Sequence, residues 1–318
     1  MNTSQNILIT GAMRSGTTYV GQVLEKAGGF TYFHEPFKNK HGITGIDHWF
    51  PFYLSNDYAE KVDNFFKGNS KFRIRKHKGN KIWEYYYKKI FGNRDQIKYR
   101  NYFKNKNTTA KKLLLKDPLA AFLSNYIYSK NNAKVVIVVR HPMAFYYSKK
   151  QKGWDFDFNN FLEQPELIDK YLKEEVPLME KAKNSGYEYR IGLLWKCIYK
   201  VLTAFENEHG NETGWIVMKH EDILESPIES FQILCDKLEI QFTDAMRTFI
   251  LETSFNKTKT LSQENQIHDF KRDSLALKDY WKKNVSLEQC EIIYGLTKEV
   301  ADLYYPETSW ELSINTSA

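Results

Sequence analysis

The sequence contains little cysteine. Its 318 residues include only Cys197, Cys235 and Cys290. Because their number is odd and their spacing wide, they predict neither a disulfide framework nor the paired ligands of a zinc site. Free cysteines of this kind are usually small core residues. We therefore expect a cytoplasmic protein in a reducing compartment, with no bound metal.

Long hydrophobic runs are absent as well. No apolar stretch approaches the roughly 18–20 residues that span a bilayer, and the polar start MNTSQN leads directly into a candidate strand. We expect no signal peptide, no membrane anchor and no membrane partner. Hydrophobic residues still make up 42% of the chain and aromatic residues 15%, which argues for a substantial core and against disorder.

Acidic residues are scarce in one segment. Between Lys67 and Lys112 the sequence has 16 Lys or Arg against two acids, Glu84 and Asp95, whereas the rest has 30 basic and 37 acidic residues. The net charge of +7 therefore comes from this basic segment, which also contains Trp83 and several tyrosines. Such a segment could bind a nucleic acid, an anionic sugar chain or an acidic small molecule. It could equally be a solvated surface whose aromatic rings pack inward.

Strand-length apolar runs alternate with longer amphipathic stretches. This pattern predicts a three-layer α/β fold of P-loop nucleotide-binding type, with a parallel sheet, helices on both faces and ligands at the carboxyl ends of the strands. Residues 37–110 do not follow the alternation, so we expect one domain, 1–318, with 37–110 as a large insertion or lid beside the site. Strands are predicted at 6–10, 113–116, 134–139 and 215–219, and helices at 17–28, 119–130, 187–209, 227–238 and 286–304.

The stretch ILITGAMRSGTTYV near the N-terminus predicts a strand, a glycine loop and a helix. Gly11 and Gly16 have the spacing of a Walker A phosphate loop and Thr18 its hydroxyl, but Thr17 stands in place of the lysine. Backbone N–H groups at such a helix start bind anions, and Arg14 adds a planar cation. Because an apolar strand ending in a Mg²⁺-binding Asp is also missing, a metal-dependent triphosphate enzyme is disfavoured.

A second stretch, VVIVVRHPMAFYYSKK, places Arg140 at a strand end and Pro142 where a helix could begin. Ser148 follows eight residues after Arg140, about two helical turns further on. Arg140 and Ser148 could therefore hold one phosphate from two sides. The alternative is an arginine paired with a surface carboxylate and a serine that faces water.

These stretches and four others together resemble the sulfotransferases that use 3′-phosphoadenosine 5′-phosphosulfate (PAPS), in particular their carbohydrate and bacterial branch. MRSGTTYV resembles the 5′-phosphosulfate loop of that family, and the run from Arg140 to Ser148 resembles its 3′-phosphate motif. The matches follow the family's order from residue 7 to about 305 and leave 37–110 unmatched. The other four are FHEPF, LLLKDPLAAFL, WIVMKHEDILESPIESFQILCDKLEI and LKDYWKKNVSLEQCEIIYGLTKEV.

The resemblance implies an enzyme that transfers the sulfuryl group of PAPS to an acceptor hydroxyl and releases adenosine 3′,5′-bisphosphate (PAP), without a metal. Glu35 would be the catalytic base, with His34 as the alternative. Since neighbouring residues of an extended segment point to opposite faces, we expect only one of the two to face the acceptor. Arg14 and Lys116 would stabilise the charge that develops during transfer.

The resemblance also implies the residues that bind the donor. Trp281 belongs to the family's closing segment, although it could instead be a core residue. The implied donor-binding residues are Arg14, Ser15, Gly16, Thr17, Thr18, Arg140, Ser148, Trp281, Lys282 and Lys283.

The acceptor is less well defined by the sequence. A saccharide or a small natural product, with or without an anionic group, fits best, and an amine or guanidine acceptor would suit the same donor site. Aromatic rings in GIDHWFPFYLSNDY could contact a cyclic acceptor or form a second core. We predict no nucleic-acid partner, and the sequence does not indicate the oligomeric state.

Three competing functions remain open at this point. A P-loop small-molecule kinase would need the missing lysine and aspartate. A nucleic-acid binder would use the basic segment but would leave Glu35, Lys116 and Arg140 without a shared purpose. A protein that binds the donor without turnover is the third.

Overall fold

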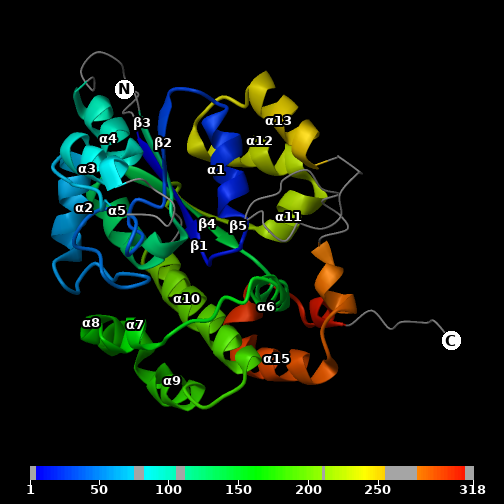
Figure 1. The fold of residues 1–318 in the computed structure, drawn as a ribbon. Coiled ribbons are helices and arrows are strands. Elements are labelled where there is room, and N and C mark those ends of the chain that lie inside the picture. Colours follow the sequence, from blue (N-terminus) through cyan, green and yellow to red (C-terminus); the bar gives the residue numbers. More distant parts are fainter. Residues whose placement is uncertain (1–4, 75–81, 105–111, 210–211, 255–277, 312–318) are drawn as a thin grey trace.

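Five strands form one parallel sheet in the order β2-β3-β1-β4-β5, as the computed structural model shows (Figure 1). The structure describes residues 5–74, 82–104, 112–209, 212–254 and 278–311. This architecture confirms the predicted α/β fold. The strands are β1 (Asn6–Gly11), β2 (Phe30–His34), β3 (Lys112–Lys116), β4 (Ala133–Val139) and β5 (Trp215–Lys219).

Helices cover both faces of the sheet (Figure 1). One face is covered by α1 (Thr17–Glu25), α11 (His220–Glu225), α12 (Pro227–Leu238) and α13 (Asp244–Ser254). The other side of the molecule contains α2 (Tyr58–Lys67), α3 (Ile82–Phe91), α4 (Arg94–Lys104), α5 (Ser124–Lys130), α6 (Pro142–Lys150), α7 (Asn159–Leu162), α8 (Pro165–Leu167), α9 (Val176–Ala182), α10 (Tyr187–His209) and α15 (Leu287–Ala301). Shorter helical turns include η1 (Pro118–Leu123), η4 (Tyr280–Lys283) and η5 (Glu307–Trp310).

The strands supply two separate cores because successive side chains point to opposite faces. Leu8 and Val135 pack into the larger core with α10, whereas Ile9 and Val136 pack into the smaller one with α1 and α12. All seven residues of β4 are buried. A continuous Val/Ile run is what a strand covered on both faces requires. The four predicted strands and the five predicted helical stretches all lie close to their expected positions.

The sequence does not predict β2, which forms one edge of the sheet. Three of its first four residues are only partly buried, and its last residue, His34, is exposed. Such an edge strand lacks the continuous apolar run by which the other strands are recognised. Its parallel register with β3 places Phe33 beside Leu115 and His34 beside Lys116.

Part of the segment expected to be an insertion is packed into the larger core. Phe50, Phe52 and Phe65 are completely buried and share that core with Leu8 and Val135 of the sheet. Most rings of the 45–58 stretch are therefore core residues rather than an open aromatic surface.

The three cysteines are free and buried, as expected for small core residues. Within the described ranges, no helix combines the length and the apolar composition needed to cross a bilayer.

Candidate active site

The carboxyl ends of the five strands lead into one cavity of about 690 Å³. Parallel strands present these ends along the same edge of the sheet, so residues far apart in sequence meet there. The loop after β1, the ends of β2 and β3, and the residues after β4 and β5 all line the cavity. From these five positions come Arg14, Glu35, Lys116, Arg140 and His220.

The glycine loop after β1 has the backbone conformation that its two glycines allow. Gly11 has a φ of 133°, and a Cβ there would meet the carbonyl oxygen of Val138 at 2.4 Å. Gly16 has a φ of 90° and directly precedes α1. Thr17 and Thr18 begin the helix at the floor of the cavity. The predicted loop and helix start are confirmed, and they direct the positive end of a helix into the cavity.

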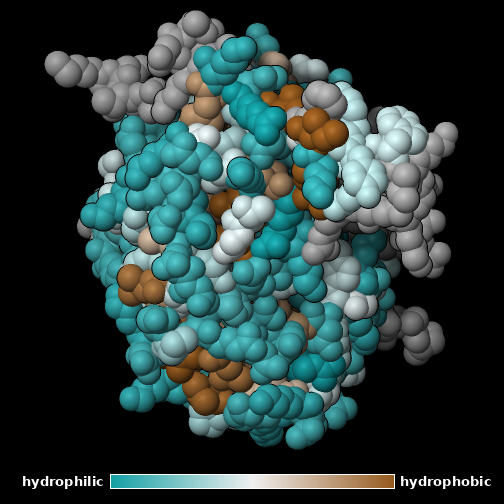
Figure 2. Space-filling model, turned by 60° about the vertical axis from the view of Figure 1, so that its left-hand side comes forward, coloured by the Kyte–Doolittle hydropathy of each residue, from teal (hydrophilic) through white to brown (hydrophobic). Residues whose placement is uncertain are grey.

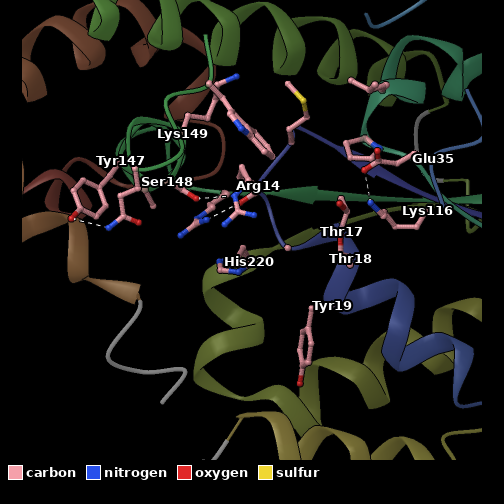
Figure 3. A pocket seen from close by; sticks show the side chains of 18 of the residues that line it. Arg14, Thr17, Thr18, Tyr19, Glu35, Lys116, Tyr147, Ser148, Lys149 and His220 are labelled. Atoms are coloured by element: carbon pink, nitrogen blue, oxygen red, sulfur yellow. Dashed lines mark hydrogen bonds and ion pairs between the residues drawn. The ribbon is translucent and has the colours of Figure 1, made fainter. Parts of the chain in front are cut away.

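Arg14, Arg140 and Ser148 meet on one side of this loop. Arg14 Nε donates a hydrogen bond to Ser148 Oγ over 3.1 Å, and an Arg140 guanidinium nitrogen donates to the carbonyl oxygen of Arg14 over 2.7 Å. Figure 3 shows Arg14 and Ser148 close together. Thr17 and Thr18 lie between them and the side of the cavity that contains Glu35 and Lys116. Helix α6 begins at Pro142 as expected, and Arg140 and Ser148 holding one phosphate from two sides stays a prediction.

Tyr199 of α10 fixes the loop from below, and the sequence analysis missed it. Its hydroxyl accepts a hydrogen bond from Ala12 N, donates to the carbonyl oxygen of Val138, and lies 3.0 Å from Ser15 Oγ. Ser15 is completely buried by this contact and is not among the residues that line the cavity. Its side chain therefore serves the loop's structure, although the sequence assigned it to donor binding.

His220 lies under the loop at the start of α11 and was also missed. A Cβ at Gly16 would meet its ring carbon Cδ2 at 2.3 Å, so ring and loop are in close contact. Burial, together with the positive charges of Arg140 and Arg14, lowers the pKa of His220 well below its ordinary value. His220 is consequently a neutral imidazole at physiological pH.

On the other side of the cavity, Glu35 and Lys116 form an ion pair of 2.8 Å (Figure 3). The second oxygen of Glu35 pairs with Lys38, also at 2.8 Å. His34 Nε2 lies 3.4 Å from the Lys116 amine and 3.5 Å from Glu35 Oε1. The expectation that His34 and Glu35 point to opposite faces is therefore wrong. Glu35 has a φ of 52°, and this left-handed turn at the end of β2 brings both side chains to Lys116.

The charge state of Glu35 follows from these contacts. Burial alone would raise its pKa, but Lys116 and Lys38 outweigh that effect and lower the pKa to about 2. The Lys116 side chain is only 1% exposed, so the pair is shielded from water on the lysine side. The carboxylate of Glu35 is thus fully ionised at neutral pH.

Asp117 holds the chain around this pair. One of its oxygens accepts a hydrogen bond from Phe37 N at 2.7 Å, and the other accepts from Leu119 N at 3.0 Å. Burial, with a further contribution from the Glu35 charge, raises the pKa of Asp117 to about 7. By binding both segments, Asp117 fixes the turn that contains Glu35 against the end of β3.

The cavity lining also includes aromatic and basic side chains, of which Trp154 and Lys149 were not assigned from the sequence. Trp49, from the 45–58 stretch, lines the cavity, and so does Trp154, which follows α6. The Arg14 guanidinium lies 5.8 Å from the Trp154 ring centroid, a cation–π contact. Lys149 is completely buried, and burial lowers its pKa to about 8 despite nearby Asp155.

The predicted closing segment contributes only in part. Trp281 lines the cavity and stacks on His141, with 4.9 Å between ring centroids and 13° between planes. It is 3% exposed and therefore also a core residue. Lys282 pairs with Asp279 at 3.2 Å, and neither Lys282 nor Lys283 is among the lining residues. Residues 255–277, which precede this segment, lie outside the described residues.

The site therefore has one side formed by the glycine loop with Arg14 and Arg140, and another side that contains a buried carboxylate–lysine pair. Within the described ranges, no three His, Cys, Asp or Glu side chains gather as a potential metal site. Tyr199 and His220 carry no local sequence signal for a role here, because α10 and β5 bring them to the loop only in the folded chain.

Comparison with known proteins gives one match to a family model, described as sulfotransferase domain, over residues 4–302. Similar solved structures include the sulfotransferase domain of the curacin biosynthetic pathway, with 16% identity, coverage of 92% of this chain and 97% of that one, and a TM-score of 0.46. The sulfotransferase domain of the Synechococcus PCC 7002 olefin synthase has 14% identity, coverage of 95% and 94%, and a TM-score of 0.48. A mouse sulfotransferase complexed with PAP has 12% identity, coverage of 97% and 88%, and a TM-score of 0.44. No curated protein sequence matches the chain.

Proposed function

This chain belongs to the sulfotransferase domain family, and from that premise we propose that it transfers the sulfuryl group of PAPS to a hydroxyl of a saccharide or small natural product, releasing PAP in the cytoplasm. One observation carries the proposal. The Glu35–Lys116 pair lines the same cavity as the glycine loop with Arg14 and Arg140. A site for an anionic donor and a buried carboxylate for an acceptor therefore open into one space.

The donor would lie along the loop and the start of α1. Backbone N–H groups of the loop and the hydroxyls of Thr17 and Thr18 suit its 5′-phosphate. Arg140 and Ser148 suit its 3′-phosphate, since one supplies a charged fork and the other a hydroxyl. The loop requires glycine at position 16, because a Cβ there would collide with the ring of His220. When bound, PAPS supplies an activated sulfuryl group.

Glu35 is the group we assign to the acceptor proton. During transfer the acceptor O–H bond breaks, its oxygen bonds to sulfur, the sulfur–phosphate oxygen bond breaks, and the proton passes to Glu35. Lys116 and Arg14 are placed to stabilise negative charge on the departing phosphate oxygen. Lys116 also sets the strength of the base, because its ammonium lowers the pKa of Glu35 while the two are paired.

The acceptor would lie on the Glu35 side of the cavity, and the cavity's aromatic lining includes Trp49 and Trp154. Two indole rings and the apolar contacts of Pro118 and Leu119 suit a cyclic scaffold. Lys38, whose ammonium reaches Glu35, adds a positive charge at this side, which suits an acceptor that carries an anionic group. These residues support a ring-containing acceptor, with a hydroxyl or amine directed at Glu35.

Calorimetric titration in EDTA tests the donor assignment. We expect PAP to bind without metal and more tightly than ADP, because only PAP has the 3′-phosphate for Arg140 and Ser148. Equal affinity for PAP and ADP, or binding only with Mg²⁺, would contradict the proposal and favour a kinase. Turnover of PAPS with a panel of saccharides and hydroxylated natural products then tests the transfer step.

Arg140→Ala isolates the 3′-phosphate contact. We expect this substitution to weaken PAP binding by about 1.5–3 kcal/mol, the range for a hydrogen bond to a charged group. ADP binding should change much less, so the difference between the two nucleotides is the measured quantity. If PAP affinity is unchanged, Arg140 does not bind the 3′-phosphate.

A further inference from the structure

Helix α3 exposes four large hydrophobic side chains on one face. Trp83, Tyr86, Tyr87 and Ile90 are 60%, 55%, 54% and 70% exposed. Their spacing of three, four and seven residues places them along one stripe of the helix. We call these four residues the α3 face. A stripe of this kind normally packs on a core, whereas here it faces the solvent.

The α3 face is a cluster rather than a scatter of single residues. Exposed large hydrophobics elsewhere in the described chain, such as Leu251, Leu287 and Leu303, are widely spaced in sequence. Isolated residues of that type are normal on protein surfaces, whereas a contiguous patch marks a contact site. Figure 2 brings forward the side of the molecule that contains α2 to α4, and hydrophobic side chains are visible there within a hydrophilic surface.

The neighbouring helix α4 is firmly attached to the rest of the protein. Tyr99 is 1% exposed and donates a hydrogen bond to the carbonyl oxygen of Phe65 over 2.7 Å. Gln96 accepts a hydrogen bond from Phe72 N, also over 2.7 Å, and the Lys98 amine donates to the carbonyl oxygen of Tyr32. The inward-packed tyrosines of the basic segment are therefore those of α4, whereas Trp83, Tyr86 and Tyr87 of α3 are exposed.

Basic residues accompany the exposed rings. Residues 82–104 contain six Lys or Arg and only two acids, Glu84 and Asp95. Lys89, Arg94 and Lys104 are exposed. A partner must therefore carry negative charge and also provide an apolar environment for Trp, Tyr and Ile side chains. The headgroup region of an anionic bilayer offers both, and amphipathic interfacial helices have this composition.

We propose that the α3 face binds peripherally to the surface of an anionic phospholipid bilayer, with the four hydrophobic side chains in the headgroup region and the basic residues beside lipid phosphates. A nucleic acid or an anionic glycan would satisfy the charges but gives Ile90 no apolar environment. The prediction of no membrane partner rested on the lack of a spanning run, and a peripheral helix needs none. With one short helix as the contact, binding is reversible and sensitive to salt. This inference does not depend on the proposed sulfuryl transfer.

Co-sedimentation of the full chain with vesicles tests the proposal. Phosphatidylcholine vesicles with about 30% phosphatidylserine should retain the protein at low salt, and pure phosphatidylcholine vesicles should retain much less, because lysines and arginines are attracted to anionic lipid. The double substitution Trp83→Ala/Ile90→Ala should weaken binding about tenfold or more, because it removes buried apolar area. Lys88→Glu/Lys89→Glu should abolish the preference for anionic vesicles.

A matched control and a second readout keep the test decisive. Leu287→Ala/Leu303→Ala removes two equally exposed apolar residues far from α3 and should leave vesicle binding unchanged. In the unmodified chain, vesicles should shift Trp83 fluorescence to shorter wavelength, measured as the difference from Trp83→Phe. Failure of the unmodified chain to bind anionic vesicles would overturn the proposal. So would an oligonucleotide affinity that is lost in the Lys88→Glu/Lys89→Glu variant but unaffected by Trp83→Ala/Ile90→Ala.

Discussion

Glu35 reaches its partners through a backbone conformation that non-glycine residues seldom adopt. Its φ of 52° ends β2 and turns the carboxylate toward Lys116, while its N–H donates to the Lys116 carbonyl oxygen over 2.7 Å. Sequence reasoning assumed an extended chain here and so separated His34 from Glu35. The identity of the carboxylate was predictable from FHEPF, but this turn was not, because no glycine or asparagine marks it.

Replacing Glu35 tests its assigned role as the base. Glu35→Gln should lower turnover of PAPS by about 10²–10⁴-fold, the usual contribution of a general base. PAP affinity, measured by calorimetry, should change little, because the proposed nucleotide site consists of the glycine loop and Arg140. The matched variant is His34→Gln, which should keep most of the activity. If instead Glu35→Gln retains full turnover and His34→Gln does not, the base is His34.

Acid should weaken the folded state through the same carboxylate. The pKa of Glu35 is lowered from its ordinary 4.5 to about 2 on folding. Between about pH 5 and pH 2 the unfolded chain therefore takes up a proton that the folded chain does not, so stability falls as pH falls. The loss attributable to Glu35 should be up to about 3 kcal/mol. Urea unfolding across this range should show a shallower pH dependence for Glu35→Gln than for the unmodified chain. Parallel curves would contradict this attribution.

At the scale of elements, α10 supports the glycine loop through a single hydroxyl, that of Tyr199. Tyr199→Phe removes that group and leaves Ala12 N–H buried without its partner. We expect a loss of about 1–3 kcal/mol in unfolding free energy and weaker PAP binding, because the loop is less well ordered. The control is Tyr189→Phe on the same helix, whose buried hydroxyl has no hydrogen-bond partner among the described residues. Similar losses in both variants would show that the Tyr199 hydrogen bonds are not the cause.

Elements with a clear hydrophobic pattern were predictable from the sequence, whereas elements that form only by pairing with a neighbouring strand were not. β4 is recognised by its continuous apolar run, and α10 by its long amphipathic pattern. β2 forms by parallel pairing with β3, and the sequence FTYFH alone does not predict that pairing. In the same way Arg140 and Ser148 could be paired from the spacing of a strand end and the helix that follows it, whereas His220 required the β5 strand to be placed beside β4.

The whole molecule should unfold as one unit, including the part of 37–110 that packs on the sheet. Phe50 is completely buried and shares the core of Leu8 and Val135. Phe50→Ala should therefore cost about 3–5 kcal/mol and lower the single unfolding midpoint followed by circular dichroism and tryptophan fluorescence. Leu54→Ala, at a half-exposed position in the same stretch, should have little effect. Two separate transitions in the unmodified chain would instead identify an independently folding insertion.

The strand order sets the distance between the two ends of the cavity. β1 lies between β3 and β4, and two strand spacings amount to about 10 Å. Lys116 at the end of β3 turns toward Glu35, and Arg140 after β4 turns toward the glycine loop. A ligand that contacts both must be elongated and lie across the end of β1. We therefore expect a compact anion such as inorganic sulfate to reach one end only, so that the strand order would favour long ligands over short ones whatever their chemistry.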